Sequence, residues 1–308
     1  MERTIKFNNV TGLLAGLTVV MIWSGWIIIS KWGVSHSLTV WDVTGLRFIT
    51  AASVILIYAL VTKTSLNVIF KPSVIFCSLC SGIFYVCASL IGLLISDAAN
   101  TGVIINGSLP IMCAVILFFW NKSRLNTSQY IGVILILLAN FLLFTSTGGA
   151  SVSALLWLLL ATFFIAFYSV SMKMWGISIK TIMLAVPLVN ALFFTPIWFF
   201  LPSHIEMAPL NEIVLQGLYQ GIVVSILALF CMSYSISKLG AVSASTIMAL
   251  VPIVSVLLAM AFLEQHMSLQ MALSIVICSL GIACYSGLHP FLVWLKKKGN
   301  KKGNPKVA

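Results

Sequence analysis

The chain has 308 residues, of which 61% are hydrophobic and 7% are charged, and its formal net charge is +11. Soluble globular chains carry about 25% charged residues, so this composition excludes a water-soluble particle. The long apolar stretches predict an all-α integral membrane protein.

Ten apolar runs follow one another along the chain, each close to the length of about 20 residues that a helix needs to cross a bilayer. They cover residues 11–30, 40–61, 74–95, 102–120, 129–146, 153–173, 181–201, 213–236, 245–263 and 269–288. We therefore predict ten transmembrane helices. The expected divisions are a flank at 1–10, five-helix repeats at 11–147 and 153–288, and a basic tail at 289–308. The first run has no small-residue cleavage motif, which predicts a retained signal anchor.

Lysine and arginine are divided very unevenly between the two ends of these runs. With the N-terminus in the cytoplasm, all but two of the 17 Lys and Arg residues fall in cytoplasmic segments. The exceptions are Lys31, which lies outside, and Arg47, which lies within the second run. Because basic residues concentrate on the cytoplasmic side, we expect an inner (plasma) membrane protein with both termini in the cytoplasm. The basic balance is thus a topology signal and does not indicate a nucleic-acid partner.

The two halves of the chain resemble each other at an offset of 142 residues, which relates Pro110 to Pro252, Lys31 to Lys173 and Trp26 to Tyr168. Five is an odd number of helices, so the second half is expected to enter the membrane inverted relative to the first. Inverted repeats are typical of secondary transporters, in which two nearly equivalent packings of the halves expose a central site to either side.

Polar and aromatic residues near the middle of a membrane are candidates for a substrate site, because polar groups in hydrocarbon need a partner or a wet cavity. We predict that this site is formed by Trp23, Trp26, Arg47, Tyr85, Asn106, Tyr168, Asn190, Tyr219, Gln220 and Ser245. Ser89 and Ser225 are further polar groups at this depth. Each proline of the repeat pair either only kinks its helix or also presents polar atoms to a cavity.

Arg47 admits two interpretations. It lies about seven residues into the second run, near 10 Å deep at roughly 1.5 Å per residue. Its long stem allows the guanidinium to extend outward to Asp42 or to the lipid headgroups. Alternatively, it faces a cavity and holds a substrate carboxylate or another counter-charge.

Motifs for enzymatic chemistry are missing from the sequence. It contains no Walker A loop, HExxH motif, Gly-x-Ser-x-Gly motif or pair of buried carboxylates. Cys77 and Cys80 have the spacing of a metal or redox pair, but they lie in an apolar run without a second pair and are interpreted as packed residues. We expect no catalytic residues, no metal and no cofactor.

Several short motifs, taken together, resemble the drug/metabolite transporter superfamily of the EamA type. They are Ile22-Trp23-Ser24-Gly25 followed by Lys31, Leu46-Arg47-Phe48, Leu109-Pro110, Val251-Pro252 and Phe262-Leu263-Glu264. One departure is Lys122, which stands where the family usually has Glu. The resemblance implies ten helices, cytoplasmic termini, a central cavity and export of amino acids, metabolites or drugs.

These observations predict a secondary transporter that exports a small metabolite, such as an amino acid or an amphipathic drug-like compound, by alternating access. The alternative is an importer or exchanger of a nucleotide- or cofactor-like metabolite. A different class, a non-transporting membrane receptor or enzyme, would lack a reason for the inverted repeat. The expected partners are the small-molecule substrate and the lipid bilayer, and a homodimer is left open.

Overall fold

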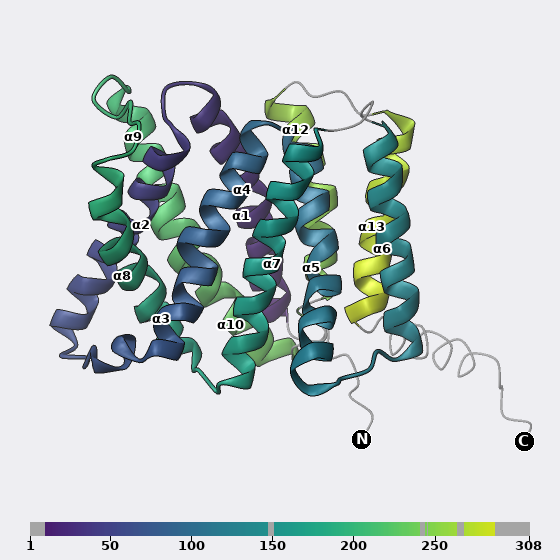
Figure 1. The fold of residues 1–308 in the computed structure, drawn as a ribbon, viewed down its shortest axis with the longest axis horizontal. Coiled ribbons are helices and arrows are strands. Elements are labelled where there is room, and N and C mark those ends of the chain that lie inside the picture. The colour runs from purple at the N-terminus through teal and green to yellow at the C-terminus, as the bar shows by residue number, and fades with distance from the viewer. Residues whose placement is uncertain (1–9, 147–150, 241–243, 245, 264–267, 287–308) are drawn as a thin grey trace, which may run out of the picture.

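The computed structural model describes residues 10–146, 151–240, 244, 246–263 and 268–286. This part of the chain is built from helices and contains no strand, as predicted. The helices stand side by side, roughly parallel or antiparallel, in a single slab (Figure 1).

The first half contains five helical segments. They are α1 (Val10–Ser35), α2 (Val40–Val61), the kinked segment α3 (Pro72–Leu79), η2 (Cys80–Phe84) and α4 (Tyr85–Leu94), then α5 (Ala98–Asn121) and α6 (Thr127–Ser146). A short 3-10 turn, η1 (Asn67–Phe70), precedes α3. The segment η2 is a π-helical turn, and it lies in the middle of the third predicted helix.

The second half repeats this order. It comprises α7 (Val152–Met174), α8 (Ile179–Trp198), the continuous segment α9 (Leu210–Gln216), η3 (Gly217–Leu227) and α10 (Ala228–Leu239), then η4 (Met248–Leu250) with α12 (Val251–Phe262), and α13 (Leu269–Ser286). The π-helical segment η3 again lies in the third predicted helix of its half.

Eight of these segments are long and apolar enough to cross a bilayer. The fifth and ninth predicted runs correspond to the apolar helices α6 (Thr127–Ser146) and η4 with α12 (Met248–Phe262). Large apolar side chains are exposed along the outside of the slab, for example Ile134, Phe141 and Leu192. Such a surface suits lipid, because a soluble monomer rarely exposes apolar patches of this extent.

The helices of the two halves interleave in matched pairs. Helix α1 packs against α10 and α12 of the other half, as α7 packs against α4 and α5. The contact of α2 with η3 is matched by that of α8 with α3, and α2–α8, α5–α12 and α6–α13 pair with their own counterparts. Gly132 and Gly281 bring α6 and α13 into backbone contact, since a Cβ on either would lie within 3.0 Å of the other's carbonyl oxygen.

The beginning of α2 is tied to the α8–α9 segment through Asp42. Thr39 and Asp42 form a capping box at the N-terminus of α2, which satisfies backbone N–H groups that have no partner within the helix. The buried carboxylate also accepts hydrogen bonds from Trp198 Nε1 (3.0 Å), Ser203 Oγ and His204 N (3.0 Å). Asp42 is therefore fully engaged in joining α2 to the second half.

Lys31 closes the C-terminus of α4. Its partly buried ammonium donates to the carbonyl oxygens of Leu93 (2.9 Å), Leu94 (3.1 Å) and Ser96 (2.8 Å). The last carbonyls of a helix have no intrahelical donor, and a cation there also interacts favourably with the helix dipole. Lys173, its partner at the repeat offset, is exposed and donates no hydrogen bond to the described residues.

We expect the Lys31→Met substitution to destabilise the protein by about 1–3 kcal/mol, because it leaves several carbonyls at the end of α4 without a donor. The measurement is thermal unfolding of the detergent-solubilised chain, with Lys173→Met as the matched control. The control is expected to change stability by less than about 0.5 kcal/mol, as exposed substitutions usually do. Equal effects of the two substitutions would contradict the assigned role of Lys31.

Candidate functional site

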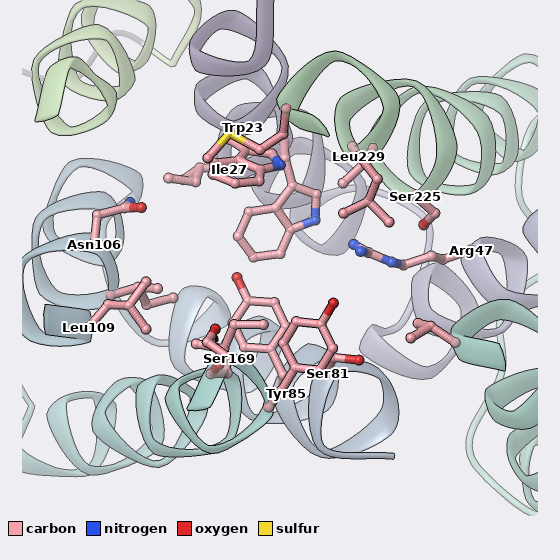
Figure 2. Close-up of a pocket in the computed structure, with 17 residues that line it drawn as sticks. Trp23, Ile27, Arg47, Ser81, Tyr85, Asn106, Leu109, Ser169, Ser225 and Leu229 are labelled. Carbon is pink, nitrogen blue, oxygen red and sulfur yellow. Dashed lines mark hydrogen bonds between the residues drawn. The ribbon is translucent and has the colours of Figure 1, made fainter. Parts of the chain in front are cut away.

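The centre of the slab encloses a cavity of about 260 Å³ that both halves line (Figure 2). Its walls come from α1, α2, the η2–α4 segment and α5 of the first half, and from α7, α8 and the η3–α10 segment of the second. The lining residues are Trp23, Trp26, Ile27, Arg47, Ser81, Tyr85, Ile105, Asn106, Leu109, Ile165, Tyr168, Ser169, Val186, Val224, Ser225, Leu229 and Met232. Most of them are apolar or aromatic, as is usual for a small-molecule pocket.

Six of the ten predicted site residues line this cavity, namely Trp23, Trp26, Arg47, Tyr85, Asn106 and Tyr168. Ser245 lies outside the described residues. The remaining three, Asn190, Tyr219 and Gln220, do not line the cavity, and each makes a contact between helices instead.

Arg47 reaches the cavity from α2, and Figure 2 shows its guanidinium extended toward the centre of the site. Its Nη1 donates a long hydrogen bond of 3.4 Å to Gln220 Oε1. No carboxylate of a described residue forms an ion pair with it, and Asp42 is occupied by Trp198, Ser203 and His204. Of the two interpretations of Arg47, the geometry supports the cavity-facing one.

Gln220 and Gln216 form a buried amide chain behind Arg47. Gln220 Nε2 donates to Ser30 Oγ (2.8 Å) and to Gln216 Oε1 (3.2 Å), and Gln216 Nε2 donates to the carbonyl oxygen of Ile29 (2.6 Å). These bonds connect α1 to the α9–η3 segment. Gln220 thereby fixes the position of Arg47 without touching the cavity itself.

Tyr219 joins the same two segments at Ile22, seven residues before Ile29 on α1. Its hydroxyl donates to the carbonyl oxygen of Ile22 at 2.9 Å, and it lies against Gly25, where a Cβ would come within 2.3 Å of the phenol oxygen. The glycine of the Trp-Ser-Gly motif therefore makes room for Tyr219. Cys77 is the residue equivalent to Tyr219 at the repeat offset. Its Sγ contacts α7 at the Tyr168 carbonyl oxygen and at Ser171 Oγ.

Asn190 fills the irregular backbone at Gly82. Its Oδ1 accepts from Ile83 N (2.8 Å), and its Nδ2 donates to the carbonyl oxygens of Ser78 (2.9 Å) and Val186 (2.7 Å). A π-helical turn leaves backbone groups without their regular partners, and this amide satisfies two of them. Ser81, within this turn, and Tyr85, directly after it, both line the cavity.

The aromatic side chains form a flat wall. Trp26 and Tyr85 are stacked, with ring centroids 6.1 Å apart and planes inclined by 27°. Trp26 is only 6% exposed, and its indole N–H has no hydrogen-bond partner among the described residues. The Nε1 atom is itself buried, so Trp26 presents its apolar ring surface, not its N–H, to the cavity.

Comparisons with known proteins place this architecture in a family. The model of the EamA-like transporter family matches residues 10–145 and again residues 152–287. The chain belongs to the EamA-like transporter family. The predicted resemblance to EamA-type transporters is thus confirmed, and the chain is a multi-pass membrane protein of a transporter family.

A solved crystal structure of a protein with 17% sequence identity to this EamA-like chain has the same fold. The match covers 91% of this chain and 98% of that chain, with a TM-score of 0.65. At this identity the likeness concerns the fold alone. The search of the curated proteins finds no match.

The family motifs take recognisable places in this EamA-like fold. Trp23, Arg47 and Leu109 line the cavity, and Lys31 binds the end of α4. Glu264 lies outside the described residues. Lys122, which departs from the family pattern, adopts a left-handed conformation (φ 58°) at the end of α5 and places its ammonium 5.4 Å from the Phe118 ring centre.

Three serines line the cavity without being among the ten predicted site residues. Ser225 stands out in the sequence as a mid-membrane polar group. Ser81 lies four residues before Tyr85, and Ser169 directly follows Tyr168. The predicted tyrosines could therefore have pointed to both serines as neighbours of the site. Ser89, by contrast, is buried in α4 and donates to the carbonyl oxygen of Val86.

Proposed function

We propose that this EamA-like protein is a secondary transporter that exports a small metabolite across the inner membrane by alternating access. The observation that carries the proposal is a central cavity lined by both halves, with a charged arginine in its wall. A charge at this depth is costly unless it has a function or a partner. Transport supplies that function, because the substrate arrives at and leaves the same site.

An inverted pair of five-helix repeats supports the alternating-access part of the proposal. In Figure 1 the α1–α2 and α8–α9 segments lie at the upper edge, whereas the α5–α6 and α7–α8 segments lie at the lower edge. Helices α1 and α7, the first of each half, accordingly run in opposite directions. With the matched helix pairs, this favours ten membrane passes and two related packings, each opening the cavity to a different side.

The distribution of charge supports the orientation. Lys63 and Lys71 flank the α2–α3 segment, and Lys122 and Arg124 lie in the α5–α6 segment, both at the lower edge of Figure 1. Glu206 lies in the α8–α9 segment at the upper edge. By the positive-inside rule, the lower edge is proposed to face the cytoplasm. Helix α1 begins and helix α13 ends at this edge, which supports the proposal of cytoplasmic termini.

Flux into proteoliposomes tests the proposal directly. The purified chain should move one or more labelled compounds from a panel of amino acids, aromatic acids and amphipathic amines, whereas protein-free liposomes should not. The uptake should stop when the gradient is dissipated, since the sequence contains no ATP-binding loop. Absence of flux across the panel would count against a transporter.

Export is tested in vesicles of defined orientation. Everted inner-membrane vesicles from cells that produce the chain should accumulate the compound, and right-side-out vesicles should release it. Accumulation only in right-side-out vesicles would instead support the importer or exchanger predicted as the alternative.

A further inference from the structure

The wall of the cavity carries an unbalanced positive charge. Among the described residues that line it, Arg47 is the only one with a formal charge, and no Asp or Glu is present. Its one protein hydrogen bond is the 3.4 Å contact with Gln220. A guanidinium has five N–H donors, so most of its hydrogen-bonding capacity remains for a ligand.

The remaining polar groups of the wall are mainly donors without acceptors. The hydroxyls of Tyr85 and Tyr168 line the cavity and form no hydrogen bond with the described residues, and each can donate a proton to a ligand. Together with Arg47, these groups offer protons from α2, α4 and α7 to the same space. A ligand that satisfies them must present several lone pairs.

The serine hydroxyls have no free proton and carry no formal charge, so they add only neutral oxygen acceptors to the wall. Ser81, Ser169 and Ser225 donate to carbonyl oxygens of their own helical segments at 3.2, 2.7 and 2.8 Å. Their protons are therefore occupied.

A cationic ligand finds little in this cavity to bind it. Asn106 donates its amide N–H to the carbonyl oxygen of Gly102 (2.8 Å), which leaves the amide oxygen as the one side-chain carbonyl in the wall. The aromatic faces attract cations, but a carboxylate binds an ammonium group more strongly. No described carboxylate lines the wall, and Arg47 repels any ammonium group in the same space.

The size and shape of the site limit the ligand further. At about 30 Å³ per water molecule, the cavity of about 260 Å³ holds on the order of nine waters. This is near the lower end of ligand pockets, so the ligand has on the order of ten non-hydrogen atoms. Trp26 and Tyr85 both line the cavity and provide apolar aromatic surface against which a planar ring can pack.

We infer that the substrate is a small aromatic monocarboxylate that lacks an ammonium group. Its carboxylate binds Arg47 and accepts from the hydroxyls of Tyr85 and Tyr168, and its ring packs against the aromatic side chains of the cavity. This inference rests on the proposed transport function and specifies the substrate class of the same cavity. It narrows the expected cargo from metabolites in general to organic anions, and it disfavours zwitterionic amino acids.

Three compounds that share one ring system separate the charge classes. Indole-3-acetate is an anion at pH 7, tryptophan is a zwitterion and tryptamine is a cation. Binding of each to the purified full-length chain is measured by calorimetry, and flux is measured in proteoliposomes. We expect indole-3-acetate to bind at least about tenfold more tightly than tryptophan, because the ammonium group has no anionic partner in the wall, and tryptamine to bind most weakly.

Two variants identify the groups responsible. Arg47→Gln should weaken indole-3-acetate binding at least about tenfold and leave tryptamine binding unchanged or tighter, since it removes the charge. Tyr85→Phe, which retains a flat ring and removes the hydroxyl, should weaken indole-3-acetate binding by roughly fivefold. Lys173→Gln, an exposed change outside the cavity, should leave all three affinities unchanged. If Arg47→Gln does not fold, the order of the three affinities for the unmodified chain still tests the proposed substrate class.

The outcomes separate this inference from the proposed function. Tryptophan or tryptamine binding as tightly as indole-3-acetate, or no binding of any of the three, would overturn the assigned substrate class. Flux of other compounds in the same liposomes would then leave the transport function intact. Conversely, tight indole-3-acetate binding that depends on Arg47, with no flux of any compound, would support the site and overturn the transporter.

Discussion

Gly82→Ala is expected to be among the most damaging single-methyl additions in the chain, with a loss of about 3–5 kcal/mol of stability. A Cβ at this position would lie 2.0–2.1 Å from three atoms of the Asn190 amide. The amide has no free direction in which to retreat, because it is buried and holds three hydrogen bonds. Overpacking costs about 1–3 kcal/mol, and each unsatisfied buried partner adds a similar amount.

A double-mutant cycle checks the physical reason for this loss. In an Asn190→Ala background the amide is gone, so adding the methyl group at Gly82 should cost less than about 1 kcal/mol. Gly217→Ala, at the beginning of the other π-helical segment, is the matched control, since its Cβ meets only Thr50 Oγ1 at 3.1 Å. Thermal unfolding in detergent measures all four variants. The same large loss in both Asn190 backgrounds would show that the clash with the amide is not the cause.

The same contact explains why one predicted site residue lies outside the cavity. Asn190 is a buried mid-membrane amide, which the sequence shows and which made it a candidate for substrate binding. Two of its three partners, Ile83 N and the Ser78 carbonyl oxygen, are backbone groups of another helical segment, exposed by a π-helical turn. That turn depends on tertiary packing, and no residue pattern between Cys77 and Tyr85 indicates it. Sequence reasoning can thus locate buried polar groups, but it cannot say whether ligand or backbone satisfies them.

Residue spacing predicted the cavity-lining residues better where helical periodicity alone decides which way a side chain points. Trp23 and Trp26, one turn apart on α1, line the same cavity, and Tyr168 lines it from the equivalent helix of the second half. Tyr219 was predicted to line the site but does not. It lies against Gly25, and its hydroxyl donates to the backbone of α1. The repeat offset therefore predicted positions in the fold better than it predicted the contacts of individual side chains.

Helix type was likewise easier to predict than the number of membrane passes. The apolar runs predicted helices throughout, and the described residues are helical over nearly all of the expected runs. The regular α-helix of the ninth run, Val251–Phe262, has only 12 residues. Apolar composition indicates that a segment avoids water, whereas the length of its regular helix also depends on caps and kinks. In the ninth run, for example, the 3-10 turn at Met248–Leu250 precedes the regular helix at Pro252.

Arg47→Gln is expected to reduce indole-3-acetate flux by about 100-fold, equivalent to about 2.7 kcal/mol, the range measured for loss of one partner of a buried charge pair. Glutamine retains a hydrogen-bonding group toward Gln220 but removes the charge that binds the carboxylate. Arg47→Lys retains the charge and loses the two-pronged geometry, so its flux should fall only about tenfold. Lys173→Gln serves as the control with unchanged flux.

Thermal stability distinguishes a substrate-binding arginine from a structural one. In the absence of ligand, Arg47 is a partly buried cation with no ion-pair partner among the described residues. Removing such a charge relieves a desolvation cost, so Arg47→Gln should unfold at the same or a higher temperature than the unmodified chain. The protein would then be as stable as before but inactive. A variant that loses stability together with flux would assign Arg47 to the fold, and a variant that transports normally would remove it from the site.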